Sequence, residues 1–256
     1  TWLLDDGKRS ELKKLAEELG AQYVTRPKNV NAKAGNMNHA LSFCKGDFFM
    51  VFDADHIAMP HALDATLGYF DHEKVAMVQT PQDFYNTDAF QYIPDKNGRL
   101  WHDQSFFYNI VQSSSNSHNG ASCIGTGVVY RRSAIDAVGG IPTETVTEDI
   151  HTSLKLHKKG YESVYLNESV AYGIAAADLD EFYVTRHRWA HGNLHAIQYE
   201  KVLTCKELSW RQKISYLWLG VIYLEGWQQL LLCLIPMGAL FFGLQPFEIT
   251  VVNILV

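Results

Sequence analysis

The sequence predicts an α/β fold with a mostly parallel sheet, followed by helices that enter a membrane. Strand-like apolar segments alternate with helix-like segments over residues 1–200, as is typical of a parallel sheet covered by helices. The apolar run at residues 48–52 ends abruptly in Asp53 and Asp55, as expected where a buried parallel strand opens onto a binding site. After Lys213 charged residues become rare and long apolar segments follow.

Composition narrows the class of protein. The 256 residues are 47% hydrophobic, which is enough for one large domain or two small ones. A net charge of -6 gives no reason to expect a nucleic-acid partner. The four cysteines have neither a Cys-x-x-Cys pattern nor zinc-ligand spacing, so we expect free thiols on the cytosolic side. Both ends of the chain lie in apolar runs, which suggests a fragment of a longer protein.

The first elements are expected to be short. We predict a strand at residues 3–4, a helix with Ser10 as N-cap and Gly20 as its stop, and a strand at residues 23–24. The apolar residues of this helix lie at helical spacing and should form its buried face: Leu12, Leu15, Ala16 and Leu19.

The polar segment at residues 31–38 is expected to be a loop before a helix that ends near Phe43. It contains Lys33 and a glycine. A lysine and backbone amides at a helix start can bind phosphate, whereas an ordinary loop that caps a helix would look the same. Both interpretations remain open from this segment alone.

Asp53 and Asp55 follow the central strand directly. Alternate residues of an extended chain share a face, so the two carboxylates can point the same way. Such a pair suits Mg²⁺ or Mn²⁺, which takes one or two protein carboxylates and completes its shell with phosphate and water. The alternative is an Asp-rich turn that only ends the strand.

The middle of the chain continues the alternation. We expect a helix at residues 60–70, a strand at 75–78 and a polar turn at 79–82 that faces the site. A helix at 100–111 and a loop at 113–119 should follow. The next strand, at 122–130, contains two glycines that indicate a close backbone approach: Gly125 and Gly127.

Two helices carry the remaining candidate residues. Thr147 is a plausible N-cap, which places Glu148 and Asp149 in the first turn of a helix that stops at Gly160. These acids either complement the helix dipole or take part in catalysis. After strands at 164–166 and near Tyr172, a long helix is expected at 178–200. On it three side chains share a face, as core or as site: Thr185, Arg188 and Trp189.

The C-terminal segment, residues 201–256, is expected to lie on and in a membrane instead of in water. Glu225 is the single charge in residues 216–242. We predict interfacial amphipathic helices at 201–226 and a transmembrane region at 227–256, with a turn at Gln245 and Pro246 into a further apolar segment. A buried helix of a soluble protein is the alternative.

Together these motifs resemble the processive glycosyltransferases of family 2, the group that contains cellulose, chitin and hyaluronan synthases. Six motifs occur in the family's order: Asp5-Asp6-Gly7, the Lys33 to Asn38 segment, Asp53-Ala54-Asp55, Thr80-Pro81, Thr147-Glu148-Asp149 and Arg188-Trp189. The resemblance extends into the membrane helices. It implies a GT-A (Rossmann-like) catalytic domain at residues 1–200, with the family's first strand missing, on the cytoplasmic face of a multi-pass protein of the inner membrane.

The resemblance also implies roles on the donor side. Asp6, with Asp5 beside it, would contact the nucleotide of a UDP-sugar, and Lys33 would lie near the diphosphate. Asp53 and Asp55 would hold the sugar and a Mg²⁺ or Mn²⁺ ion.

Further roles follow on the acceptor side. Asp149 would be the base and Arg188 would serve the diphosphate, while Glu148 and Trp189 would contact the acceptor. Thr185 stands where the family has glutamine, and its side chain is shorter.

The expected function is therefore membrane-bound, inverting transfer from a UDP-sugar, with UDP-glucose the first choice, to a growing β-linked polysaccharide such as cellulose. The expected partners are the donor, the polysaccharide acceptor, the lipid bilayer and further subunits of a synthesis or export complex. Three alternatives remain open. The donor could be UDP-N-acetylglucosamine or GDP-mannose, the product a single sugar on a lipid, or the protein a non-catalytic membrane scaffold.

Overall fold

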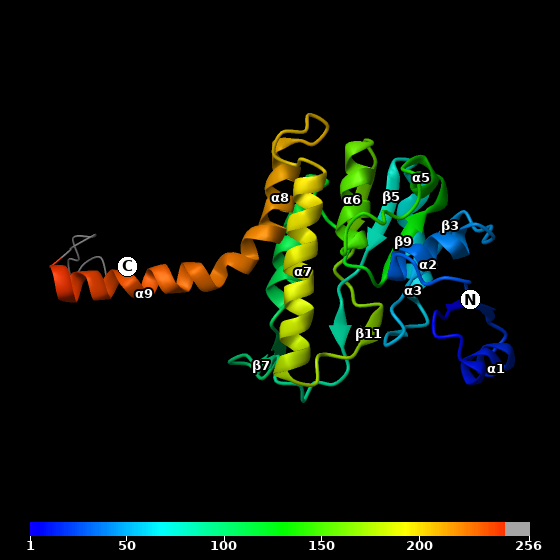
Figure 1. The fold of residues 1–256 in the computed structure, drawn as a ribbon, viewed down its shortest axis with the longest axis horizontal. Coiled ribbons are helices and arrows are strands. Elements are labelled where there is room, and N and C mark those ends of the chain that lie inside the picture. The colour runs from blue at the N-terminus through cyan, green and yellow to red at the C-terminus, as the bar shows by residue number, and fades with distance from the viewer. Residues whose placement is uncertain (244–256) are drawn as a thin grey trace.

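The computed structural model describes residues 1–243, in which an α/β body continues into helices that lead away from it (Figure 1). The central sheet has four strands in the order β10-β5-β9-β3. Their bounds are Glu162–Tyr165, Val75–Gln79, Val128–Arg131 and Phe48–Val51.

The central sheet is mixed, so the prediction of a mostly parallel sheet is only partly right. β10 and β5 are parallel, whereas β9 is antiparallel to both β5 and β3. The loop before β9 lies at the carboxyl ends of β3 and β5, where the Asp53 N–H donates to Thr126 Oγ1 at 3.2 Å. β9 starts from that edge and must run back in the opposite direction.

β3 is a half-buried edge strand within the described residues, not the buried parallel strand that its apolar sequence predicted. Its hydrogen-bonded neighbour is β9 alone. Both faces are packed nevertheless. Phe48 and Met50 join the cluster around Phe70, and Phe49 and Val51 join the main core. The exposure of β3 therefore comes from its free edge.

The N-terminal elements are a parallel strand pair and one helix. β1 (Trp2–Leu4) pairs with β2 (Gln22–Val24) as predicted, and α1 spans Ser10–Glu18. The N-cap is Arg9, not Ser10, because the Asp5 carboxylate accepts the N–H groups of Gly7 and Arg9 and fixes the turn one residue earlier.

The predicted buried face of α1 is largely wrong. Leu15 is 47% and Leu19 74% exposed, while Ala16 is buried. The helix packs on β2 at its edge, and little of its surface is covered.

α2 spans Ala32–Leu41, so most of the segment predicted as a loop is helical. Asn31 adopts a left-handed conformation at φ 61° and sets the turn into the helix. Ala34, Met37 and Leu41 recur at helical spacing and are buried in the core, which stabilises the helix despite its polar residues.

Residues 83–120 differ most from expectation. The segment predicted as a helix at 100–111 begins as strand β8 (Leu100–His102), which pairs antiparallel with β7 (Tyr92–Pro94). Its turn is specified by Asp95, which accepts the N–H groups of Asn97 and Arg99, and by Gly98 at φ 75°. Helical structure follows in η2 (Phe107–Gln112, a π-helix), which agrees with the second half of the predicted helix. It continues in α4 (Ser113–Asn116), where the loop at 113–119 was predicted.

The remaining elements of the body include the predicted helices at 60–70, after Thr147 and at 178–200 and the predicted strand near Tyr172, together with short elements at 57–58, 83–84 and 132–137 that were not predicted. They are β4 (Ile57–Ala58), α3 (Ala62–Leu67), η1 (Gly68–Asp71), β6 (Asp83–Phe84), α5 (Arg132–Ala137), α6 (Glu148–Lys158), β11 (Ala171–Gly173) and α7 (Leu179–Tyr199). β4, β11 and β6 form a small separate sheet. Asp178 caps α7 by accepting the Glu181 N–H.

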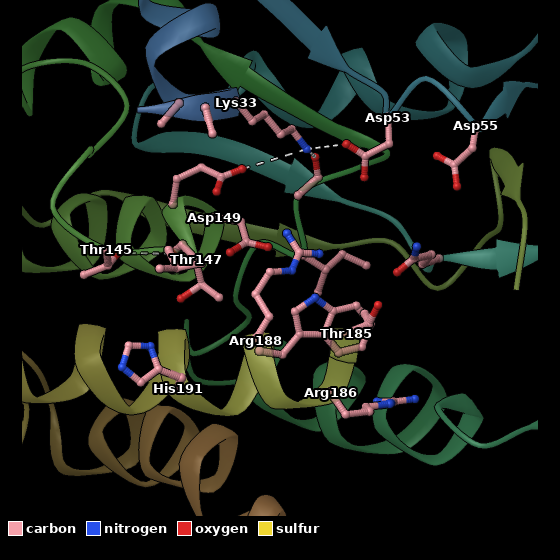
Figure 2. A pocket seen from close by; sticks show the side chains of 18 of the residues that line it. Lys33, Asp53, Asp55, Thr145, Thr147, Asp149, Thr185, Arg186, Arg188 and His191 are labelled. Atoms are coloured by element: carbon pink, nitrogen blue, oxygen red, sulfur yellow. Dashed lines mark hydrogen bonds and ion pairs between the residues drawn. The ribbon is translucent and has the colours of Figure 1, made fainter. Parts of the chain in front are cut away.

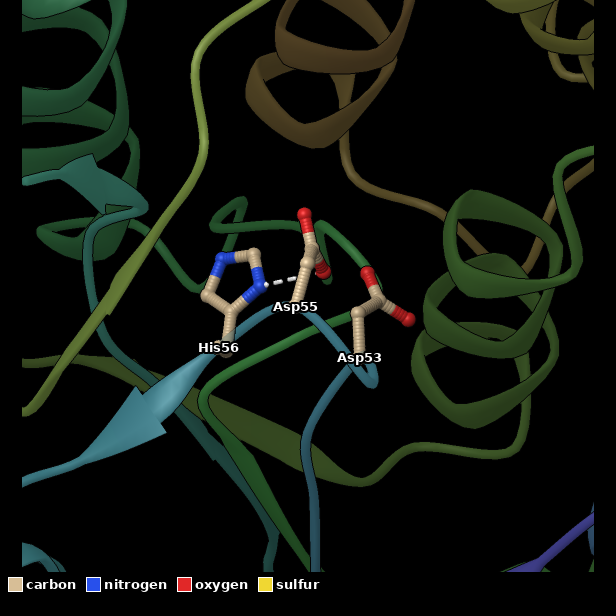
Figure 3. A group of neighbouring side chains, drawn as sticks. All are labelled: Asp53, Asp55 and His56. Carbon is tan, nitrogen blue, oxygen red and sulfur yellow. Dashed lines mark hydrogen bonds and ion pairs between the residues drawn. The ribbon is translucent and has the colours of Figure 1, made fainter. Parts of the chain in front are cut away.

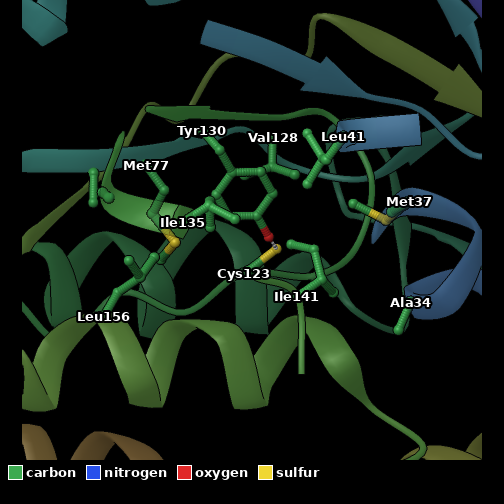
Figure 4. Packing of buried hydrophobic residues seen from close by; sticks show 12 residues of the cluster. Ala34, Met37, Leu41, Met77, Cys123, Val128, Tyr130, Ile135, Ile141 and Leu156 are labelled. Atoms are coloured by element: carbon green, nitrogen blue, oxygen red, sulfur yellow. Dashed lines mark hydrogen bonds between the residues drawn. The ribbon is translucent and has the colours of Figure 1, made fainter. Parts of the chain in front are cut away.

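The core lies between the central sheet and α2, α5 and α6 (Figure 4). A second apolar cluster joins α6 to α7 and α8 through Leu154, Ala196 and Tyr216, all fully buried. The helix that begins with Glu148 and Asp149 is therefore held from both sides.

The C-terminal helices are α8 (Trp210–Val221), η3 (Ile222–Leu224) and α9 (Glu225–Phe242). The helical stretch Trp210–Phe242 is long and apolar enough to cross a membrane. No residue of α9 is buried, so within the described residues it is not a core helix of this domain. The predicted turn at Gln245 and Pro246 and the segment after it lie outside the described residues.

Candidate active site

A cavity of about 850 Å³ opens at the carboxyl ends of β3 and β5. Its walls come from the start of α2, the loop after β3, the start of α6 and one face of α7. It brings together eight predicted residues that are far apart in the sequence: Lys33, Asp53, Asp55, Glu148, Asp149, Thr185, Arg188 and Trp189. In Figure 2, Lys33 and Asp53 lie across the cavity from Thr185 and Arg188, with Asp149 between them.

Lys33 is the electrostatic centre of the wall formed by α2, the loop after β3 and the start of α6. Its Nζ donates to Asp53 Oδ1 at 2.5 Å and to the Gly125 carbonyl at 2.7 Å, and lies 3.9 Å from Glu148 Oε1. Burial alone would lower the pKa of Lys33, but the neighbouring carboxylates, Asp53 foremost, outweigh it and raise the pKa. The ammonium is therefore charged, and it joins α2, β3 and α6 at one point.

Asp53, Asp55 and His56 form a compact group of metal-ligand types (Figure 3). One ligand atom of each lies within 4.8 Å of the others, and His56 Nδ1 lies 2.9 Å from Asp55 Oδ1. The His56 side chain is fixed against Gly173, where an added Cβ would lie 2.4 Å from the ring. Two carboxylates and an imidazole fit a divalent ion such as Mg²⁺ or Mn²⁺.

Asp149 has the properties of a general base. Burial, and then the negative charge of Glu148, raise the pKa of Asp149 to about 7. One oxygen accepts the Ile150 N–H at 2.8 Å. The other faces Gly125, where an added Cβ would lie 3.0 Å from Asp149 Oδ2 and where φ is 88°. A larger residue at position 125 would fill the space in front of the carboxylate.

The loop opposite Asp149 is held by buried polar groups. Gln79 accepts the Ile124 N–H at 2.9 Å and donates to the Thr126 carbonyl at 2.7 Å, while Thr80 donates to the Gly127 carbonyl at 2.9 Å. Both side chains are fully buried. Of the polar turn predicted to face the site, Gln82 lines the cavity, whereas Gln79 and Thr80 support its wall.

The exposed face of α7 forms the wall of the cavity that lies across from Lys33 and Asp53 (Figure 2). Thr185, Arg188 and Trp189 all line the cavity, and Trp189 is half-buried. Arg186, which the sequence did not single out, lies 4.9 Å from the Trp189 ring centroid and 4.8 Å from that of Phe182. It also forms an ion pair with Asp103. The guanidinium thus covers one face of Trp189 and fixes the ring.

Asp5 and Asp6 do not line the cavity. The Asp5 carboxylate is 2% exposed, and hydrogen bonds led by the Arg9 side chain lower its pKa. Asp6 accepts two hydrogen bonds from Arg26, at 2.7 and 2.6 Å, and Arg26 also donates to the Ala32 carbonyl. Asp6 therefore supports, through Arg26, the turn that presents Lys33, whereas Asp5 holds the turn before α1 through Gly7 and Arg9. The contact of either acid with a nucleotide stays a prediction.

Known proteins resemble this chain over most of its length. Residues 3–192 match the family described as "Glycosyltransferase like family 2". The chain belongs to this family. Residues 136–255 also match the cellulose synthase family.

The relatives of this family 2 chain include bacterial cellulose synthases. The UDP-forming catalytic subunit of Xanthomonas axonopodis pv. citri is 39% identical over 84% of this chain and 30% of its own length. That of Pseudomonas fluorescens is 35% identical over 96% of this chain and 33% of its own. The chain thus spans about a third of the length of these relatives.

Solved structures establish the GT-A fold of the domain. The mannosyltransferase of Pyrobaculum calidifontis, in complex with GDP-Man and Mn²⁺, gives a TM-score of 0.62 at 20% identity over 86% of this chain and 58% of its own. S. aureus TarS 1-349 with UDP-GlcNAc gives 0.55 at 14% identity over 86% and 62%. Such low identity supports the fold and not the substrate.

Two site residues of the family 2 domain were missed by sequence reasoning. His56 follows Asp55 directly, so its place in the same turn was a usable signal. No local sequence pattern indicated Arg186, because its role depends on Asp103, which lies 83 residues away.

Proposed function

We propose that this chain is part of a membrane-bound inverting glycosyltransferase that transfers glucose from UDP-glucose to a growing β-linked polysaccharide such as cellulose. The observation that carries the proposal is the pairing, in one cavity, of the cationic Lys33 with Asp149, whose pKa is raised to about 7. The UDP-forming cellulose synthase relatives support the donor.

The transfer step needs a base on one side and cationic groups on the other. Asp149 accepts the proton of the acceptor hydroxyl as that oxygen forms a bond to the anomeric carbon. The bond to the diphosphate breaks on the opposite face of the sugar, so configuration inverts and UDP leaves. Lys33 and Arg188 stabilise the negative charge of the departing diphosphate.

A divalent ion fits the acidic group beside Lys33. Asp53 and Asp55 would hold Mg²⁺ or Mn²⁺, with His56 as a further ligand, and the ion would offset the charge of the diphosphate. A GT-A neighbour solved with Mn²⁺ supports this assignment.

The acceptor is assigned to the wall formed by α7. The Trp189 ring stacks on the terminal sugar, and Glu148 contacts the same acceptor. Thr185 lies one turn earlier on the same face, where its short hydroxyl leaves room for water or a different acceptor group.

The membrane arrangement is proposed from the C-terminal helices. α9 spans the bilayer, α8 lies at its surface, and the catalytic domain faces the cytoplasm in a multi-pass protein of the inner membrane. Further subunits of a synthesis or export complex complete the proposal.

The test is a donor screen with membranes that contain the full-length protein. Labelled UDP-glucose, UDP-N-acetylglucosamine and GDP-mannose are compared, and we expect polymer from UDP-glucose alone. If polymer forms from another donor, UDP-glucose is wrong as the substrate, but the assignment as a polysaccharide-forming glycosyltransferase stands. No transfer from any donor, with folded protein present, would favour the non-catalytic scaffold.

A further inference from the structure

The β7–β8 hairpin exposes apolar side chains on both of its faces. Ile93 and Trp101 are cross-strand partners and are 67% and 40% exposed. Pro94 and Leu100 are the next pair and point to the other face, with Leu100 50% exposed. We call these four residues the hairpin patch. A two-stranded hairpin in water is marginal without a packed face, so this patch indicates a missing neighbour.

The base of the hairpin, in contrast, is held firmly. His102 is buried, and the Tyr92 hydroxyl donates to the Phe84 carbonyl at 2.9 Å. Asp103, directly after β8, forms the ion pair with Arg186 of α7. The hairpin is therefore a fixed projection of the catalytic body, and its apolar tip has a defined direction.

The hairpin lies beside the point where α9 leaves the body. A second cavity, of about 460 Å³, is lined by Asp103 and Phe106, which follow β8. It is also lined by Ile222 and Tyr223 of η3 and by Glu225, the first residue of α9. Figure 1 shows β7 projecting on the same side of the body as α9. α1 lies at the opposite end of the molecule.

The same side carries a second exposed apolar stripe on α8. Trp210, Ile214, Trp218 and Val221 recur every three or four residues and are 66%, 56%, 42% and 51% exposed. The hairpin and α8 thus both expose apolar side chains and both lie on the side of the body from which α9 leaves (Figure 1).

We infer that the hairpin patch inserts into the lipid surface beside α9 and forms a second membrane contact of the catalytic domain. Tryptophan is enriched at membrane interfaces, and Lys96 and Arg99 of the turn can reach lipid phosphates. The Asp95 carboxylate of the same turn offsets one of these two positive charges, which leaves residues 95–99 with a net positive charge. This inference rests on the proposed membrane association of α8 and α9.

Photo-crosslinking in native membranes tests it. p-Benzoylphenylalanine replaces Ile93 of the full-length protein, and adducts are identified by mass spectrometry. Leu19, 74% exposed near α1, serves as the matched control on the far side, and Leu231, 62% exposed on α9, reports whether that helix lies in lipid. We expect phospholipid adducts at positions 93 and 231 and at least tenfold fewer at 19.

The outcomes separate this inference from the proposed function. Lipid adducts at 231 but not at 93, or adducts at 93 with polysaccharide or another protein, would overturn the inference alone. Equal lipid yields at 93 and 19 would also overturn it. Absence of lipid at both 93 and 231 would overturn the membrane assignment with it. Sugar transfer by the same membranes reports independently on the catalytic proposal.

Discussion

The half-buried carboxyl group of Asp149 should weaken the fold as pH rises. Its pKa is about 7 in the folded chain against an ordinary value of 3.8. Between these values the unfolded chain releases the proton and the folded chain keeps it, so the free energy of unfolding falls with pH. About three pKa units at roughly 1.4 kcal/mol each give about 4 kcal/mol as an upper limit for this cost above pH 7.

The Asp149→Asn substitution removes that cost and leaves the volume of the side chain almost unchanged. The variant should match the parent in apparent Tm at about pH 4 and exceed it at pH 8, because both states of the parent are ionised only at the higher pH. The assay is a thermal shift series from pH 4 to 8 on the purified full-length protein. Asp136→Asn, at an exposed carboxylate of α5, is the control and should show no comparable gain. A Tm difference between Asp149→Asn and parent that stays constant with pH would refute the reasoning.

Three further variants test other parts of the site. Asp55→Asn should abolish divalent-dependent transfer without unfolding the protein, and full activity of this variant in EDTA would contradict the metal assignment. Trp189→Ala should stop elongation while donor hydrolysis persists, at a stability cost well below the roughly 3–5 kcal/mol of a core tryptophan; normal elongation would contradict the acceptor role. Gly192→Ala places a Cβ 2.4 Å from Thr147 Cγ2, so transfer and Tm should both fall. Gly68→Ala meets nothing within 4 Å and is its matched control; equal effects of the two would refute the packing argument.

Much of the fold could be predicted where one local signal dominates. The predicted strand at residues 75–78 is a continuous apolar run, and all residues of the observed Val75–Gln79 strand are buried. α7 has helical periodicity, an Asp cap and 21 residues, and the three side chains predicted to share a face all line the cavity. Eight residues that were predicted from the order of the motifs also line one cavity in the structure.

The failures occurred where distant contacts override local pattern. The direction of β9 depends on a loop that meets Asp53, 73 residues away, and no periodicity encodes it. The second strand of the hairpin at 92–102 was predicted as part of a helix. Asp95 and Gly98 are residues typical of a tight turn, and they were the local signal for the hairpin. The N-cap is Arg9 instead of Ser10 because Asp5 accepts the Arg9 N–H and fixes the preceding turn one residue earlier.

The central claim is that Asp149 is the base of a glycosyl transfer carried out in this cavity. The most direct measurement is the single-turnover rate of transfer from UDP-glucose by full-length parent and Asp149→Asn proteins, with UDP affinity measured on the same samples. We expect Asp149→Asn to bind UDP as tightly as the parent and to transfer sugar about 10²- to 10⁴-fold more slowly. The rate of the parent should rise with pH through about 7. An Asp149→Asn protein that transfers sugar at the parent rate would contradict the central claim.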